Sequence, residues 1–507
     1  MSSLDRSGSE RPPTRGTLPL ARQFSRAAFW NTLLLPVIAA LNLAFAILIR
    51  RWFGLFSGVY DVLVGVMAAL QLYSSVGIPA GLSKFLPEVD ASSGPAGVRR
   101  FLRQAVTIRV LLLGLLLVPL NVFAVPISRS FGLGADGPTY LGVLSGLAFG
   151  RVVVDLMLKT LQAFFAQFWA NLLTVMMGAL DLLLVGLVLL LGYEMGGLLG
   201  ALLISSLVTA ICGTGVATWL LRRPVVVDRP DDEPRFSGRG LWLEGQGIRF
   251  FRFSGFTYVF GLTGFFTGIG FAAPVLALVL TPEQVALFAT AFKLTHTTVA
   301  LVVSSFRGLY QPLFTRLRIR SDPEQLRQAF VAVSKAQLVV LLPAGAGLLV
   351  MSGDYVPLLF GPEFQPAVAI AWVLVPLMYA ATVFNLPGII LMVGEQYRAL
   401  VWTQAIGIVA APVFVVAAAS NGLVAAAMVL GGSSLARALG AYVLCRRVYG
   451  VRFPWVFAVR IGMVSLVMAT ALAATRAIWA TSLFEAITLT LAGAIGYGVG
   501  LRLVGAL

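Results

Sequence analysis

The sequence predicts an all-α polytopic membrane protein with about fourteen transmembrane helices. The chain has 507 residues, of which 59% are hydrophobic and only 11% are charged. A soluble protein carries about 25% charged residues, so this composition excludes a pair of soluble domains. Apolar runs of about 20 residues, the length that spans ~30 Å of hydrocarbon, recur along the whole chain. Basic residues separate these runs and do not gather in one patch, which argues against a nucleic-acid partner.

The apolar runs define the expected spans in chain order. They lie near residues 28–49, 55–77, 104–127, 139–159, 168–192, 196–220, 254–280, 285–310, 328–351, 366–392, 399–419, 421–444, 455–475 and 480–501.

The lysines and arginines predict the orientation of these spans. With a cytoplasmic N-terminus, most of the 37 basic residues fall in cytoplasmic segments, chiefly the first 26 residues, 84–103 and 222–252. The predicted outer segments hold only Arg50, Arg51, Arg129 and Arg476. Both termini are therefore expected in the cytoplasm.

A short internal repeat predicts two related halves. The motif at 102–105, LRQA, recurs at 326–329, each time where a span is expected to begin from the inside. A proline, Pro119 or Pro343, follows at the same distance in both copies. This match predicts a parallel six-plus-six repeat with two additional helices. The expected parts are a disordered basic cytoplasmic tail at 1–26, an N-terminal six-helix lobe at 27–221, a cytoplasmic linker with an amphipathic segment at 222–253, a C-terminal six-helix lobe at 254–446, and helices 13 and 14 at 447–507.

A polar stripe on the expected eighth span is the main candidate for a functional site. At about 100° per residue its members share one face of the helix. A lysine at mid-bilayer costs roughly 2.5–3.5 kcal/mol, so the stripe must face protein or a wet cavity. The candidate substrate-binding residues are Lys293, His296, Thr297, Ser304 and Arg307 of this stripe, together with Asp61 of the second span.

Each of these residues also has a purely structural interpretation. Lys293 could be neutral or paired with an acid in a buried contact between lobes, and Arg307 could extend to the inner headgroups. His296, the only histidine, could couple transport to protons or simply fill space. Asp61 could supply the charge opposite Lys293 or cap a helix at the outer interface.

A second charged pattern lies in the fourth span. Arg151, Asp155 and Lys159 alternate in sign at i, i+4 and i+8, which lets them neutralise one another along one helix face. We expect a structural ion-pair stripe inside the N-terminal lobe. A cation site that also uses Asp181 is the alternative. Arg109, near the inner end of the third span, is expected to extend to the headgroups.

Residues 53–88, FGLFSGVYDVLVGVMAALQLYSSVGIPAGLSKFLPE, resemble a known transporter family. A glycine-rich span ends at Gly77 and is followed by a basic and apolar segment around Lys84. The eighth span has Ala291 and Lys293 early and Pro312 at its inner end. These features resemble the oligosaccharide flippases (polysaccharide transporters) of the multidrug/oligosaccharidyl-lipid/polysaccharide exporter superfamily.

The resemblance implies a V-shaped bundle of two six-helix lobes around a central cavity. It further implies a flippase in the cytoplasmic (inner) membrane of a bacterium that works by alternating access. Because each chain already contains two lobes, a monomer is the expected state. The implied cargo is an undecaprenyl-diphosphate-linked oligosaccharide, and polysaccharide polymerases or glycosyltransferases are the implied partners. Cations and hydroxyls of the stripe would replace the hydration that the diphosphate loses.

Enzyme classes find little support in the sequence. It contains no Walker motif, zinc spacing or nucleophile elbow, so we expect neither an ATPase nor a hydrolase, and no cofactor. The energy for transport would then have to come from an ion gradient such as H⁺ or Na⁺, from the membrane potential, or from onward polymerisation of the product. A cation-coupled multidrug-type exporter is the main alternative, although it would favour acids over the basic stripe. A membrane glycosyltransferase or O-antigen polymerase would need a larger outer loop.

Overall fold

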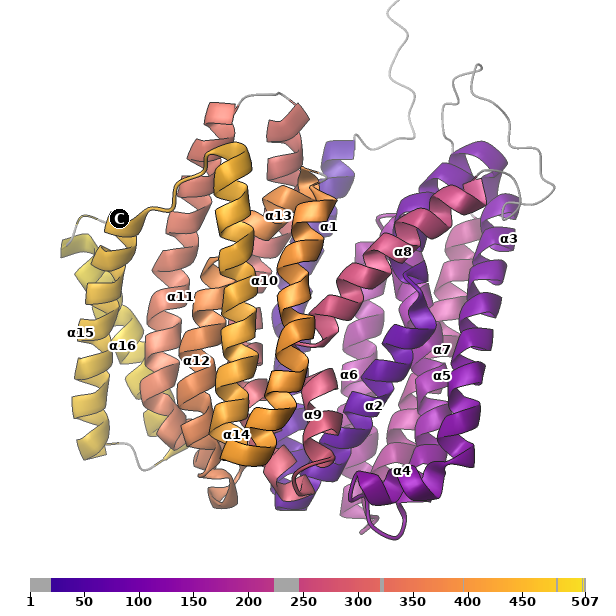
Figure 1. The fold of residues 1–507 in the computed structure, drawn as a ribbon, viewed down its shortest axis with the longest axis horizontal. Coiled ribbons are helices and arrows are strands. Elements are labelled where there is room, and N and C mark those ends of the chain that lie inside the picture. Colours follow the sequence, from indigo (N-terminus) through magenta and orange to yellow (C-terminus); the bar gives the residue numbers. More distant parts are fainter. Residues whose placement is uncertain are drawn as a thin grey trace, which may run out of the picture.

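The computed structural model describes residues 20–222, 246–319, 323–394, 396–479, 482–503 and 505. Within these ranges the chain is helical and has no β-strand, as the composition predicts. The expected basic tail up to residue 19 and most of the expected linker, residues 223–245, lie outside them. Most helices of the second half lie on one side of the molecule, while α8 of that half crosses to the side formed by α2, α3, α5 and α7 (Figure 1).

The N-terminal half contains seven α-helices and one short 3₁₀ turn in the described residues. They are α1 (Leu20–Phe53), η1 (Gly54–Phe56), α2 (Ser57–Ser75), α3 (Ile78–Val122), α4 (Ala124–Ser130), α5 (Gly137–Ala163), α6 (Gln167–Leu190) and α7 (Met195–Arg222).

The C-terminal half and the two final helices complete the described chain. They are α8 (Gln246–Phe265), α9 (Ile269–Ala277), α10 (Pro282–Ile319), α11 (Pro323–Phe360), η2 (Pro362–Phe364), α12 (Ala367–Val383), α13 (Leu386–Val393), α14 (Tyr397–Tyr449), α15 (Trp455–Trp479) and α16 (Leu483–Leu503). The last two pack on α11 and on each other, around an apolar cluster of their own.

The helices are long and apolar enough for a multi-pass membrane protein. Ten of the described helices could each cross a membrane, or eleven if the bent pair α8–α9 forms one span. The predicted count of fourteen is therefore not confirmed. Two of the ten, Leu33–Ser75 and Leu400–Tyr449, have 43 and 50 residues, about twice the length of one crossing. Each contains a break at a glycine with positive φ, Gly54 at +54° and Gly422 at +75°.

The break between α8 and α9 does not lie at Pro274, the proline of the second of these helices. α8 ends at Phe265 and α9 begins at Ile269, with a bend of 54° between them. Pro274 lies inside α9, and its ring occupies the space left by Gly65 of α2. Pro274 therefore makes a close contact between α9 and α2, and the bend between α8 and α9 lies at the turn that ends at Gly268.

The first turns of α8 lie within the segment 222–253, for which the sequence predicts a linker with an amphipathic part. Phe250 is 2% exposed and makes edge-to-face contacts with Phe85 and Phe101 of α3. This turn of α8 thus packs on the N-terminal half of the protein, because its aromatic side chains find an apolar partner there.

The two halves meet along α2, which packs against α9 and α10. A Cβ atom on Gly58 would lie 1.7 Å from the carbonyl oxygen of Pro282, the first residue of α10. One on Gly65 would lie 2.3 Å from Cδ of Pro274. Only glycine permits such approach, so the backbones of the two halves touch here. We call this contact of α2 with α9 and α10 the seam, and its Gly58 end the lower end, as oriented in Figure 1.

Candidate functional site

A buried arginine joins three helices at the lower end of the seam. α1 ends just after Arg50, η1 reverses the chain, and Asp61 follows in the second turn of α2. The Arg50 Nη2 atom lies 2.6 Å from Asp61 Oδ2, and Arg50 Nε donates to the Thr290 hydroxyl of α10 at 2.7 Å. The side chains of Arg50 and Asp61 are only 1% and 7% exposed. The ion pair therefore belongs to the N-terminal half, whereas the hydrogen bond crosses the seam.

The guanidinium of Arg50 is not fully satisfied by these contacts. Its Nη1 atom is buried and has no hydrogen-bond partner among the described residues. Its Cζ atom lies 5.9 Å from the centroid of the Phe364 ring. A buried arginine that lacks an acceptor is costly, because each unmade hydrogen bond leaves a desolvated donor.

Lys293 follows Thr290 one turn further along α10 and is half-buried. Its Nζ atom lies 6.0 Å from the centroid of the Tyr60 ring on α2. Arg50 and Asp61 are the charged groups with which it interacts electrostatically. Lys293 therefore belongs to the same cluster across the seam as Arg50, Asp61 and Thr290, which we call the seam cluster.

Asp61 lies on the helix that packs against α10 and interacts electrostatically with Lys293, as one sequence interpretation expected, but it does not form an ion pair with that lysine. Its ion pair is formed with Arg50, not with Lys293, and the carboxylate is buried and does not cap a helix end. The sequence reasoning missed Arg50 because it counted this residue among the outer-segment cations. The available signal in the sequence was Asp61, an acid eleven residues further on, across the turn between the first two spans.

The other predicted members of the stripe are described to different extents. His296 is exposed, and its ring stacks on Phe292 with centroids 5.7 Å apart. Thr297 is half-buried. α10 runs through Ser304 and Arg307, but the side chains of these two residues lie outside the described part of the structure.

The angular positions of residues around the axis of α10 show where the polar stripe lies relative to the seam. Pro282 and Thr290 contact the N-terminal half, and at 100° per residue they lie within about 80° of Lys293 around the helix. Thr297 lies about 40° from Lys293 on the same side. The predicted polar face is thus the continuation of the face that touches α1 and α2.

The three charged residues of the α5 stripe do not pair with one another. Arg151 Nη2 lies 2.7 Å from Asp181 Oδ2 of α6, while Lys159 donates to the side chain of Gln162 at 3.2 Å. For Arg151 the predicted pairing within α5 is therefore replaced by a contact with the facing helix, because its long side chain reaches an opposite charge on a packed neighbour. Lys159 instead bonds to a neutral side chain of α5 itself.

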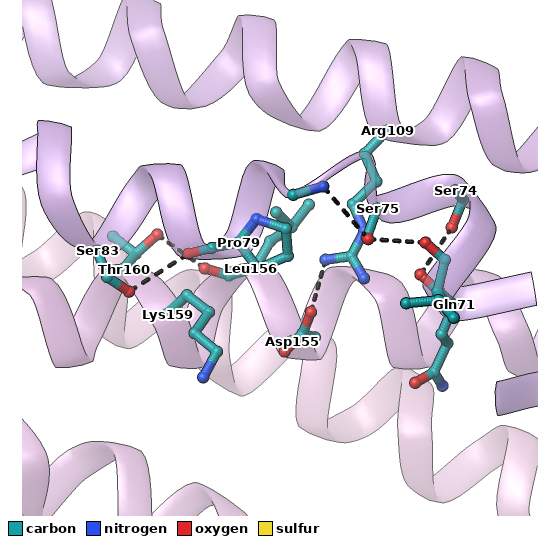
Figure 2. Close-up of polar contacts among 12 residues, drawn as sticks. Gln71, Ser74, Ser75, Pro79, Ser83, Arg109, Asp155, Leu156, Lys159 and Thr160 are labelled. Carbon is teal, nitrogen blue, oxygen red and sulfur yellow. Dashed lines mark hydrogen bonds and ion pairs between the residues drawn. The ribbon is translucent and has the colours of Figure 1, made fainter. Parts of the chain in front are cut away.

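Asp155 pairs with Arg109 of α3, whose Nη1 atom lies 2.6 Å from Asp155 Oδ2. Arg109 is 2% exposed, so the expectation that it extends to the headgroups is wrong. Figure 2 shows this pair beside the end of α2, next to Ser75 and Gln71. Since Asp155 and Asp181 each have an arginine partner, their charges are already neutralised. Among the described residues no group of three or more His, Cys, Asp or Glu side chains could hold a metal ion.

Two helical halves that meet at the seam, with ten or eleven candidate spans in the described residues, define a multi-pass membrane fold. The protein superposes on a solved lipid II flippase MurJ in an inward closed conformation with a TM-score of 0.72 and 14% identity, covering 95% of this chain and 98% of that one. An inward-facing multidrug resistance MATE family transporter of the MOP superfamily gives a TM-score of 0.63 and 17% identity, covering 82% and 94%. At these identities the likeness establishes the fold.

The family of polysaccharide biosynthesis proteins matches residues 162–369 of the chain. Together with the flippase-like fold, this match confirms the recognition made from the sequence: the chain is similar to the polysaccharide and lipid-linked oligosaccharide flippase family. No curated protein sequence matches the chain.

Proposed function

We propose that this protein is a flippase for a polyprenyl-diphosphate-linked oligosaccharide in polysaccharide biosynthesis. It would carry its cargo from the inner to the outer leaflet of a bacterial cytoplasmic membrane by alternating access of the two halves. Both termini would be cytoplasmic, so the lower end of the seam would be the outer end. The chain would act as a monomer, since it contains both halves, beside the enzymes that build and polymerise the sugar.

The observation that carries this proposal is the pair of cations in the seam cluster, Arg50 and Lys293. A diphosphate brings at least two negative charges into the bilayer, where the loss of hydration is expensive. Guanidinium and ammonium groups provide charge-assisted hydrogen bonds that compensate for that loss. A site between two halves is also where alternating access requires cargo to bind.

The second candidate is a cation-coupled multidrug-type exporter, which the likeness to multidrug transporters supports. Such a protein needs free carboxylates facing an organic cation. Asp61, Asp155 and Asp181 are each paired with an arginine at 2.6–2.7 Å. This pairing removes the attraction for a cation and favours the anionic cargo.

Lys293→Ala tests the proposal, with Lys335→Ala as the matched control. Both ammonium groups lie over an aromatic ring, Lys293 over Tyr60 at 6.0 Å and Lys335 over Phe457 at 5.3 Å, but only Lys293 lies at the seam. In a strain that lacks its own flippase, Lys293→Ala should abolish complementation while the protein still accumulates in the membrane, and Lys335→Ala should complement. Normal export of labelled lipid-linked sugar by Lys293→Ala would refute the assignment.

Proteoliposomes separate the two candidates and identify the energy source. A flippase should expose a fluorescent polyprenyl-diphosphate sugar on the opposite leaflet and leave cationic dyes untouched, whereas an exporter should do the reverse. We propose that a proton or sodium gradient supplies the energy. If imposed pH gradients leave the rate unchanged, His296 has no coupling role.

A further inference from the structure

Arg50 has more hydrogen-bond donors than the closed seam can satisfy. A guanidinium offers five N–H donors in a planar fork. Here one nitrogen faces Asp61, one faces Thr290, and Nη1 is buried without a partner in the described residues. The side chain is 1% exposed, so in this conformation neither water nor cargo reaches it. Any ligand of Arg50 must therefore compete with Asp61 and Thr290.

A diphosphate is the stronger competitor. Asp61 offers one charge, and only its Oδ2 atom lies at 2.6 Å from the guanidinium. A diphosphate offers at least two charges and several oxygens, which suit the bidentate geometry that arginine adopts with phosphate. A neutral headgroup or a cation offers nothing that could replace the carboxylate.

Lys293 brings such an anion within reach of Arg50. The lysine is half-buried and lies three residues, about 4.5 Å of helix rise, beyond Thr290 on the same face of α10. An anion held by Lys293 therefore lies next to the atoms that close the lower end. Both cations can then bind the same diphosphate once the helices part.

We propose that Asp61 is an internal substitute for the diphosphate of the cargo, and that exchange of one for the other at Arg50 opens the lower end of the seam. The proposal rests on the proposed function and deepens it. When the diphosphate takes Arg50, the guanidinium leaves Thr290. Among the described residues this breaks the one side-chain hydrogen bond between Arg50 and the opposite half. When the cargo leaves, Asp61 recovers Arg50 and the seam closes again.

This exchange makes an unusual prediction about Asp61. If the carboxylate competes with the cargo, Asp61→Asn should tighten binding of a diphosphate by about tenfold, within the usual range of coupling between two ligands. The same variant should slow transport, because the closed state is no longer restored by an internal anion. A carboxylate that only supports the fold, or that binds cargo itself, would give the opposite sign or no change in affinity.

The binding experiment uses the purified full chain in nanodiscs with geranylgeranyl diphosphate as the probe. Asp155→Asn is the matched control, since it also removes an acid 2.6 Å from a buried arginine, Arg109, but away from the seam cluster. We expect tighter diphosphate binding for Asp61→Asn alone and unchanged, weak binding of geranylgeraniol for all variants. Equal or weaker diphosphate binding by Asp61→Asn would overturn the exchange. If the unaltered protein binds no diphosphate at all, the proposed function fails as well.

Thr290→Val provides an independent test should Asp61→Asn fail to fold. It removes the bond across the seam and keeps the ion pair between Arg50 and Asp61. Ser57 is 0% exposed at the lower end, so a cysteine there reports opening. With the exposed Cys212 replaced by serine, Thr290→Val should speed labelling of that cysteine by an impermeant maleimide about fivefold or more. An unchanged labelling rate would show that Arg50 does not hold the seam.

Discussion

Gly58→Ala should prevent the two halves from closing at the lower end. The added Cβ would lie 1.7 Å from the carbonyl oxygen of Pro282 and 3.1 Å from the backbone nitrogen of Ala286. Both obstacles are backbone atoms of α10 and cannot rotate away. Ordinary contact begins near 3.4 Å, so α2 and α10 must separate by about 1.7 Å at this point.

That displacement has a calculable effect on the seam cluster. The bond from Arg50 to Thr290 measures 2.7 Å, and an added separation of this size takes it beyond hydrogen-bonding distance. Overpacking typically costs about 1–3 kcal/mol, and a hydrogen bond to a charged group contributes about 1.5–3 kcal/mol. Either term alone shifts a two-state equilibrium by roughly fivefold or more. The ratio of the closed state to the open state should therefore fall about fivefold or more.

Spin labels on α1 and α10, or cysteine labelling at position 57, would measure this shift. Gly58→Ala should lengthen the distance between α1 and α10 at the lower end, with transport reduced. Gly200→Ala in α7 is the control, because a Cβ there meets nothing within 4 Å and should leave both readouts unchanged. If Gly58→Ala gives the same distance distribution as the original protein, the seam is not a rigid backbone contact and the reasoning is wrong.

Two further predictions concern stability, each measured as the change in thermal unfolding in detergent. Asp155→Asn should destabilise the protein by about 3 kcal/mol because it leaves Arg109 buried and unpaired. Arg109→Met should cost only about 1 kcal/mol because the remaining Asp155 is 34% exposed and reaches solvent. Equal losses of stability in the two variants would contradict this asymmetry. Phe250→Ala should cost about 3–5 kcal/mol because it leaves a cavity beside Phe85 and Phe101. A loss below about 1 kcal/mol would indicate that this turn of α8 does not pack on α3 and lies at the membrane surface, as an amphipathic segment would.

The sequence predicted the helical membrane fold because that prediction depends on composition and on run length alone. The stripe on α10 was predictable for the same reason, since helical phase fixes which residues share a face. The ion pairs were not predictable in this way. Arg151 and Asp155 have suitable partners within their own helix, and only the packing of α5 against α3 and α6 decides that each pairs elsewhere.

Arg50 illustrates a second limit of sequence reasoning. A basic residue at the end of an apolar run usually marks the membrane surface, and the count of basic residues treats it so. Arg51 fits that expectation better, because it is exposed and donates to the carbonyl of Leu359 at the end of α11. Its neighbour in the chain points into the seam instead. Two adjacent arginines with opposite environments can be told apart only once the tertiary contacts are known.

The backbone contact at Gly58 also bears on the electrical resistance of the membrane. A transporter that opens to each side in turn must not pass ions while it is shut. At the lower end, helix backbones in direct contact leave no space for a chain of water molecules between Gly58 and Pro282. Closing the seam therefore insulates the bilayer, and a cell that expresses a loosened variant should lose membrane potential even when no cargo is present.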